Sequence, residues 1–246
     1  LTTLAASPDG ESFPKSDWQD RQDPVASPYA EPGGILRFAA FQPPKSLNAY
    51  IDANTYTRQI FGMMYETLLN NDSDTMEFTP GLAARWSISG DKSTYTFEID
   101  PAARWSDGAP VTAQDVKWTF DQVMDPKNAT GSSKVALGVF ESPEALSAST
   151  VRFRAKESHW RNLLALGSFE IMPRHAFWQQ DFNRLDFDNP VVSGPYVLSS
   201  VKEQIEIRMS KRGDWWAGAK ASSRNIMNFD TIVFRYFTDN ENAFEA

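Results

Sequence analysis

The most informative stretch of the chain is WSDGAPVTAQDV (residues 105–116), in which a strand end, a tight turn and a helix start follow one another. The aromatic residue Trp105 comes just before an Asp-Gly pair, which is typical of tight turns. Thr112 and Asp115 have the spacing of a capping box, with Asp in place of the usual Glu. The segment therefore predicts a strand that turns sharply into a helix.

The helix predicted after this cap is amphipathic and lies next to a β-hairpin in the sequence. Apolar residues recur at helical spacing over 116–124, and the pattern stops before Pro126. Upstream, residues 86–99 contain two runs of alternating polar and apolar residues around Gly-Asp-Lys, which is typical of a hairpin. We expect the helix to cover the hairpin, with Trp105 and Phe120 buried.

The rest of the chain adds strands and helices that do not alternate regularly. The predicted strands are 35–41, 150–154, 196–198, 205–209 and 230–236, and the predicted helices are 54–69 and 160–166. No internal repeat is visible. This mixture predicts the α+β class, a mixed α/β chain rather than a doubly wound one.

The order of these segments also predicts a division of the chain. Residues 1–34 contain five prolines and no apolar periodicity, so we expect a flexible leader there, or one draped over the surface. We expect residues 35–47 and 173–246 to form a sheet domain, in which strand 35–41 joins the strands within 196–236. Residues 48–172 would then form an inserted subdomain around the hairpin and its helix.

Composition excludes several classes of function. The 246 residues carry a net charge of −8 with no long basic run, which disfavours nucleic acid as a partner. No apolar stretch is long enough to span a membrane. The chain has no cysteine, and its two histidines, His159 and His175, do not have metal-site spacing. Because nucleotide-binding and nucleophile motifs are also missing, we predict no cofactor, no metal site and no catalytic residue.

Six motifs in register carry a family resemblance. The chain resembles the family 5 extracellular solute-binding proteins, the peptide and nickel receptors of bacterial ABC importers, over about residues 33–246. The motifs are MYETLL (64–69), TPGLAARW (79–86), WSDGAPVTAQDV (105–116), SGPY (193–196), RGDWW (212–216) and NFDTI (228–232). We expect the motif residues to be scaffold rather than ligand contacts.

The resemblance implies a fold, a function and a location. Members of the family are typically twice this long and close two lobes on a ligand, and this chain resembles most of the first lobe, with the second lobe absent. The implied function is to bind oligopeptides or related small solutes in the cleft between the lobes and to deliver them to a membrane ABC permease. The implied location is the periplasm, or the outside of the cytoplasmic membrane through a lipid anchor.

The resemblance also implies that three loops face the cleft. Hydroxyl and amide groups there suit a peptide backbone, which offers alternating donors and acceptors. The same residue types are common in turns and caps for purely backbone reasons, so both interpretations stay open. The candidate ligand-binding residues are Asn54, Thr55, Tyr56, Ser132, Ser133, Ser168 and Phe169.

Two other classes of function remain open from the sequence. One is a peptide-processing hydrolase built on a carboxylate pair such as Asp181 and Asp186, which would release stable products from labelled peptides. The other is a signalling or scaffold protein that presents a bound peptide to a membrane partner. Nickel or haem as the ligand would be a variant of the receptor function.

Overall fold

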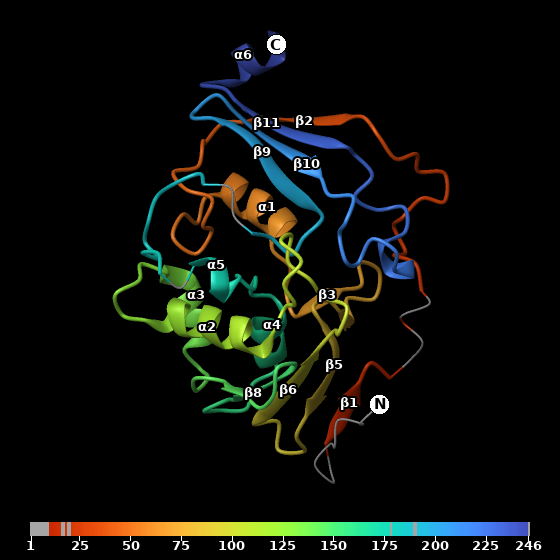
Figure 1. Ribbon diagram of the computed structural model, residues 1–246, viewed down its shortest axis with the longest axis vertical. Coiled ribbons are helices and arrows are strands. Elements are labelled where there is room, and N and C mark those ends of the chain that lie inside the picture. The colour runs from red at the N-terminus through yellow and green to blue at the C-terminus, as the bar shows by residue number, and fades with distance from the viewer. Residues whose placement is uncertain (1–9, 16–17, 19–20, 178, 189–190, 246) are drawn as a thin grey trace.

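The computed structural model describes residues 10–15, 18, 21–177, 179–188 and 191–245 (Figure 1). The strands are β1 (Glu11–Phe13), β2 (Ile35–Ala40), β3 (Leu69–Asn71), β4 (Phe78–Pro80), β5 (Ala83–Ile88), β6 (Thr94–Ile99), β7 (Glu144–Ala145), β8 (Thr150–Arg154), β9 (Tyr196–Lys202), β10 (Glu206–Lys211) and β11 (Thr231–Tyr236). The helices are α1 (Thr55–Met64), α2 (Ala113–Met124), α3 (Gly131–Leu137), α4 (Asn162–Gly167), α5 (Arg174–Phe177), the 3-10 helix η2 (Ala221–Ser223) and α6 (Asn240–Glu245).

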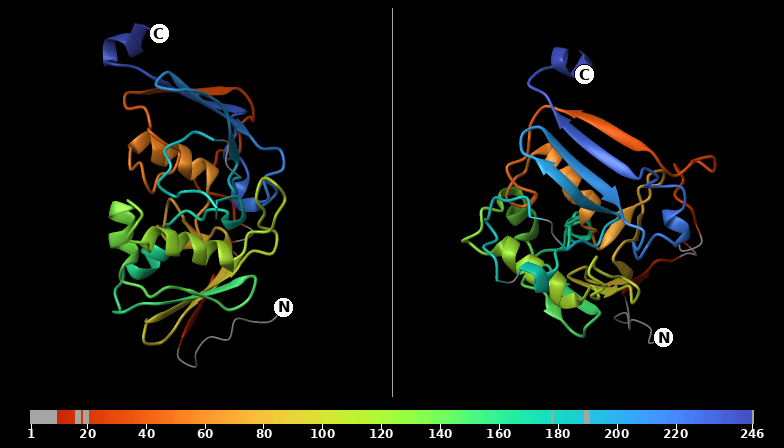
Figure 2. Two further views of the ribbon diagram at one scale, coloured as in Figure 1. Left: turned by 60° about the vertical axis from the view of Figure 1, so that its left-hand side comes forward. Right: turned by 45° about the horizontal axis from the view of Figure 1, so that its top comes forward.

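Two sheets enclose the larger helices in a layered arrangement. The four-stranded sheet lies at the top of Figure 1, the five-stranded sheet lies at the bottom, and α1 and α2 lie between them, as the turned views of Figure 2 also show. A third, two-stranded sheet pairs β3 with β4. In the part of the chain that the structure describes, no helix is long and apolar enough to cross a membrane.

The four-stranded sheet has the order β2-β11-β10-β9, and β2 runs parallel to β11. The predicted pairing of strand 35–41 with the strands of 196–236 is thereby confirmed. Helix α1 packs beneath this sheet, where the ring of Tyr56 meets Phe234 edge-on at 6.4 Å. Because α1 lies within 48–172, the predicted inserted subdomain is in contact with the sheet domain from its first helix onward. The division into these units stays a prediction.

The five-stranded sheet is antiparallel, with the order β1-β5-β6-β8-β7. Strand β6 alternates buried apolar residues with half-exposed polar ones, as a strand with one covered face does. Helix α2 covers that face and starts at the predicted capping box: the Asp115 carboxylate accepts from the Thr112 backbone N–H at 2.8 Å. Trp105 and Phe120 are 1% and 2% exposed, which confirms their predicted burial.

The described part of the predicted leader lies against the rest of the chain, whereas residues 1–9, 16–17 and 19–20 of that prediction lie outside the described residues. Strand β1 pairs with β5 at the edge of the five-stranded sheet, and the ring of Phe13 stacks on Trp86 at 5.4 Å. Farther along, Trp18 is buried, and the backbone N–H of Gly33 donates to the Asn228 carbonyl at 2.8 Å. A three-residue strand is too short to show periodicity, but the unpaired edge of β5 supplies the hydrogen bonds that order it.

Candidate functional site

The carboxyl ends of β2 and β11 meet the amino end of α1 on the left-hand side of Figure 1. Their parallel register sets Ala40 opposite Tyr236, and the backbone N–H of Phe237 donates to the Ala40 carbonyl at 2.8 Å. Asn54 caps the first N–H groups of α1, so this region offers strand ends and side-chain polar groups rather than free helix donors. We call this region, residues 40–43, 52–57 and 236–237, the α1 face.

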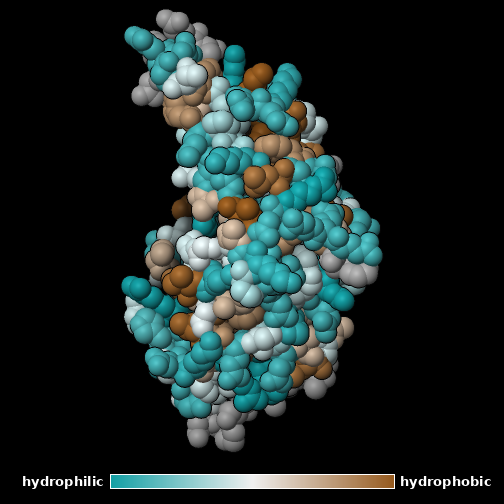
Figure 3. All heavy atoms as spheres, turned by 90° about the vertical axis from the view of Figure 1, so that its left-hand side faces the viewer, coloured by the Kyte–Doolittle hydropathy of each residue, from teal (hydrophilic) through white to brown (hydrophobic). Residues whose placement is uncertain are grey.

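The α1 face combines polar and apolar residues. Figure 3 views the molecule from this side, where apolar residues lie among polar ones and the outline recedes below the projecting carboxyl-terminal end. A mixed surface of this kind suits a ligand that has both polar and apolar parts.

Asn54, the first predicted contact, is the N-cap of α1. Its side-chain oxygen accepts from the N–H groups of Tyr56 at 2.8 Å and Thr57 at 3.4 Å. Its amide nitrogen donates to the carbonyls of Gln42 at 2.9 Å and Pro43 at 3.4 Å. The side chain thus holds the helix start against the end of β2, which is a scaffold role. Of its two predicted neighbours, Thr55 is exposed and Tyr56 is half-buried.

An unsatisfied hydroxyl group lies at the α1 face. Tyr236 is 8% exposed, and its hydroxyl has no hydrogen-bond partner among the described residues. Burial, and then the charges of Tyr56 and Asp52, raise the pKa of Tyr236 well above its ordinary value, so the hydroxyl keeps its proton. The Asp52 carboxylate is held by the Lys45 backbone N–H at 2.7 Å and the Thr57 hydroxyl at 3.1 Å. A buried donor left unpaired costs about 1–3 kcal/mol, which an acceptor on a ligand would relieve.

The structure brings the second predicted segment next to the first. Arg58, one turn into α1, donates through Nη2 to the hydroxyl of Ser132 at 3.5 Å. Ser132 and Ser133 lie in the first turn of α3 rather than in a loop, and the Ser133 N–H donates to the Thr130 carbonyl. The predicted loop at this position is therefore a short helix whose start faces Arg58.

The third predicted segment lies elsewhere. Ser168 follows α4 and is exposed, with its backbone N–H bonded to the Leu164 carbonyl. Phe169 is 6% exposed, and its ring packs edge-on against Phe153 in the core at 6.3 Å. Within the described chain, no hydrogen bond or aromatic contact joins either residue to the α1 face. Local sequence does not show that the ring turns inward. Ligand contact at any of the seven candidates stays a prediction.

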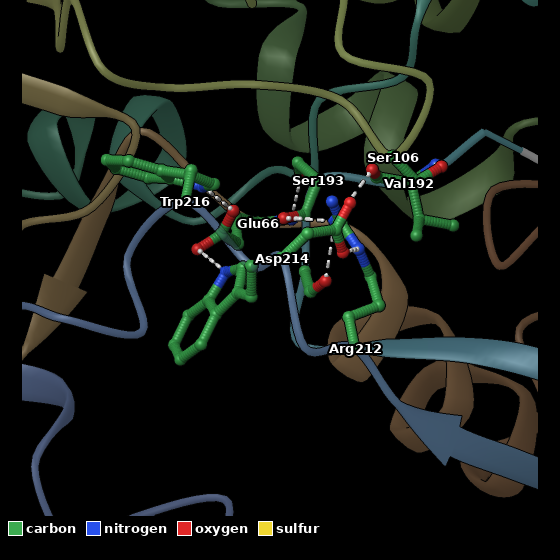
Figure 4. Close-up of polar contacts among 9 residues, drawn as sticks. Glu66, Ser106, Val192, Ser193, Arg212, Asp214 and Trp216 are labelled. Atoms are coloured by element: carbon green, nitrogen blue, oxygen red, sulfur yellow. Dashed lines mark hydrogen bonds and ion pairs between the residues drawn. The ribbon is translucent and has the colours of Figure 1, made fainter.

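Three of the family motifs converge near the other end of α1, on Glu66 (Figure 4). The Glu66 carboxylate accepts from the indole N–H of Trp215 at 3.2 Å and of Trp216 at 2.6 Å, while its backbone N–H donates to the Ser193 hydroxyl at 3.0 Å. Burial raises the pKa of Glu66 to about 7, against the lowering effect of these hydrogen bonds. We call Glu66, Trp215 and Trp216 the Glu66 cluster.

Arg212 binds the backbone of the SGPY motif, which contacts Glu66. Its side chain is 3% exposed and donates through Nη1 to the carbonyls of Val192, Ser193 and Gly194 at 3.0–3.2 Å (Figure 4). A Cβ atom on Gly194 would lie 2.5 Å from the Met63 carbonyl, so only glycine allows this approach to the end of α1. Three motifs far apart in sequence are therefore one packing unit, as a scaffold role predicts.

Comparisons with known proteins identify the family of this chain. A family model described as "Bacterial extracellular solute-binding proteins, family 5 Middle" matches residues 77–246. The chain belongs to this family. Family 5 members are solute-binding receptors, which is the class that the motifs predicted.

Curated relatives of this family 5 chain are longer than it is. It is 29% identical over 236 residues to the peptidoglycan-binding protein YepA of Agrobacterium fabrum, covering 92% of this chain and 38% of that protein. It is 28% identical over 225 residues to YejA of Escherichia coli, covering 89% of this chain and 36% of YejA. The chain thus spans less than half the length of the relatives it matches.

Solved structures show the two-lobe periplasmic-binding-protein fold, of which this family 5 chain covers a part. The Helicobacter pylori DppA complex with the peptide STSA superposes with a TM-score of 0.73 at 24% identity, over 88% of this chain and 45% of DppA. The Escherichia coli murein tripeptide binding protein MppA superposes with a TM-score of 0.70 at 19% identity, over 87% of this chain and 44% of MppA. Identities this low establish the shared fold alone.

Sequence reasoning named Tyr56 but missed Tyr236 as a site candidate. The sequence did contain a signal, because the strand pattern of 230–236 puts Ile232, Phe234 and Tyr236 on one face. What the pattern lacks is the parallel partner: only the register of β2 with β11 brings Tyr236 to the amino end of α1.

Proposed function

We propose that this chain is the ligand-binding lobe of a substrate-binding receptor of an ABC importer, and that it binds oligopeptides or related small solutes at the α1 face. A second lobe would cover the ligand, and the loaded receptor would deliver it to a membrane permease. The protein would act in the periplasm, or on the outside of the cytoplasmic membrane through a lipid anchor. The family membership supports the receptor class, since family 5 has periplasmic homologues.

The observation that carries this proposal is the unpaired Tyr236 hydroxyl where two parallel strand ends meet a helix amino end. A peptide carbonyl would accept from this hydroxyl, and the exposed Thr55 hydroxyl would supply a further polar contact. The printed descriptions of relatives favour peptides: DppA was solved with a peptide, and MppA is described as a murein tripeptide binding protein. Another relative in fold, AgaA, was solved with agropinic acid, so related solutes stay within the proposal.

If a second lobe shares the ligand, the residues of this chain would supply only part of the contacts, so we expect weak binding by the chain itself. A receptor with micromolar affinity gains about 8 kcal/mol on binding, and half of that corresponds to a millimolar dissociation constant. Contact energies are not additive, so this arithmetic gives the expected range of the dissociation constant rather than one value.

The experiment is a titration of the isotope-labelled chain with trialanine, followed by NMR, with maltotriose as a solute of similar size but different chemistry. We expect saturable trialanine binding in the millimolar range, with shifted amides at the α1 face, and no saturable maltotriose binding. Shifts confined to other surfaces, or no saturable binding by trialanine, would contradict the proposal. Mass spectrometry of the same sample tests the hydrolase alternative. Accumulation of alanine or dialanine with time would show that the chain hydrolyses the peptide and is an enzyme rather than a receptor.

A further inference from the structure

A cavity of about 370 Å³ opens beside the Glu66 cluster at the carboxyl end of α1. Helix α1 has ten residues, so this cavity lies roughly 15 Å along the helix from the α1 face. Its wall comes mainly from four parts of the chain: Trp18 with residues 21–24, the end of α1, the β3–β4 hairpin and the β10–β11 connection. Glu170 and Pro195 complete it. We call it the tryptophan cavity, because Trp18, Trp215 and Trp216 all line it.

The wall carries an excess of negative charge. Glu66 and Glu170 both line the cavity, and burial raises the pKa of each carboxyl group. Antiparallel bridging of Thr67 with Glu170 holds the two acids on neighbouring backbone segments. Within the described part of the chain, neither carboxylate has an ion-pair partner within 4.0 Å. A cation bound in the cavity would offset their desolvation.

One of the two basic residues of the wall is already paired with an acid. The Lys220 ammonium group donates to the Asp100 carboxylate at 2.6 Å. Hydrogen bonds from its own turn, and to a smaller extent the charge of Arg21, lower the pKa of Asp72, but the described residues show no ion pair between Arg21 and Asp72. Lys220 and Arg58 lower the pKa of Glu66 and of Glu170 through their charge, but in the described part of the chain neither forms an ion pair with these carboxyl groups.

Aromatic rings and unpaired donors complete the site. The Lys220 nitrogen lies 4.1 Å from the centroid of the Trp216 ring, so this wall already holds one cation against an indole face. Trp18 and Tyr65 both line the cavity, and the indole N–H of the one and the hydroxyl of the other are buried without a hydrogen-bond partner among the described residues. The described chain contains no group of three or more residues suited to a metal ion.

We propose that the tryptophan cavity binds a small organic cation, an alkylammonium or quaternary ammonium group that also carries a hydrogen-bonding oxygen. The positive nitrogen lies near Glu66 and Glu170 and against the tryptophan rings. The oxygen accepts from the Trp18 indole or pairs with the Tyr65 hydroxyl. Carboxylates alone would accept many cations, but the aromatic wall favours a weakly hydrated organic one. This site is separate from the α1 face and does not depend on the proposed peptide binding.

The test uses the chain labelled with 5-fluorotryptophan, because 19F NMR resolves individual tryptophans. Single Trp→Phe variants assign the resonances of Trp18, Trp215 and Trp216. The labelled protein is titrated with choline, with ethanolamine and with 3,3-dimethylbutan-1-ol, which has the shape of choline without its charge. We expect at least one of the two cations to shift these three resonances saturably, with a dissociation constant below about 1 mM, and the neutral alcohol to bind at least tenfold more weakly.

Two variants separate the charge of the cavity from charge elsewhere. Glu170→Gln is expected to weaken cation binding at least tenfold, whereas Glu141→Gln, which removes an exposed acid outside the cavity, leaves it unchanged. Equal binding of choline and its neutral analogue overturns the proposal, and so does the absence of saturable shifts with both cations. If Glu170→Gln does not fold, the comparison of cation with neutral alcohol on the unaltered chain decides alone.

Discussion

Replacing Glu66 by Gln should remove a dependence of stability on pH that the folded chain acquires through this one carboxyl group. Burial raises the pKa of Glu66 from its ordinary 4.5 to about 7. Between these values the folded state holds a proton that the unfolded state has released. The free energy of unfolding therefore falls as pH rises through this window, and the contribution is lost above pH 7.

The size of the effect follows from the pKa change. A rise from 4.5 to about 7 corresponds to about 3 kcal/mol of stability at low pH, and most of it, about 2–3 kcal/mol, is lost between pH 5 and pH 8. Gln resembles the protonated acid in shape and keeps one acceptor for the indole N–H groups of Trp215 and Trp216. We therefore expect Glu66→Gln to match the unaltered chain near pH 5 and to be the more stable of the two at pH 8.

Urea denaturation followed by far-ultraviolet circular dichroism, at half-unit steps from pH 5 to pH 8.5, measures this difference. Subtracting one protein from the other cancels the titration of all other groups that both share. Glu141→Gln is the matched control, because it removes an exposed carboxylate and should leave the difference flat. A difference for Glu66→Gln that changes by less than about 0.5 kcal/mol over this range would refute a carboxyl group buried as the structure has it.

Three further substitutions test the packing. Trp105→Ala removes a fully buried ring and should lower the free energy of unfolding by about 3–5 kcal/mol in a reversible melt, and a loss below about 1 kcal/mol would mean an exposed ring. Thr112→Ala breaks the capping box of α2 and should cost about 1 kcal/mol, with no cost if the helix starts elsewhere. Phe13→Ala removes the ring stacked on Trp86 and should lower the free energy of unfolding, measured by urea denaturation, by about 1–2 kcal/mol. An unchanged midpoint would mean that this segment is a flexible leader.

Much of the fold is readable from the sequence where structure is local. The hairpin of β5 and β6, the capping box at Thr112 and strand β8 follow from periodicity and capping residues within short windows. Helix α3 was not predicted, because it starts at Gly131 and continues with two serines, which are weaker helix formers than alanine or leucine. Strand β1 was not predicted either, because a neighbouring edge, rather than its own pattern, orders it.

Long-range pairings limited the prediction of the sites. Glu66 is visible in its motif, yet its partners Trp215 and Trp216 lie about 150 residues away, and nothing local pairs them. Phe169 has the sequence surroundings of a loop, yet its ring fills the core. Tyr236 depends on the parallel register of β2 with β11, which no turn or cap signals. Local rules predict elements well, and the contacts that make a site arise between them.

Two tyrosine hydroxyls provide the most direct test of ligand binding at the α1 face. Tyr236 has its hydroxyl unpaired there, whereas the hydroxyl of Tyr196, in the same sheet, donates to the Phe229 carbonyl at 2.8 Å. The measurement is the trialanine dissociation constant of Tyr236→Phe and Tyr196→Phe by NMR titration, each with its urea midpoint. We expect Tyr236→Phe to weaken binding about fivefold or more without losing stability, and Tyr196→Phe to lose about 1 kcal/mol of stability without changing affinity. Unchanged affinity in Tyr236→Phe, together with lost stability, would show that the Tyr236 hydroxyl serves the scaffold and would contradict binding at the α1 face.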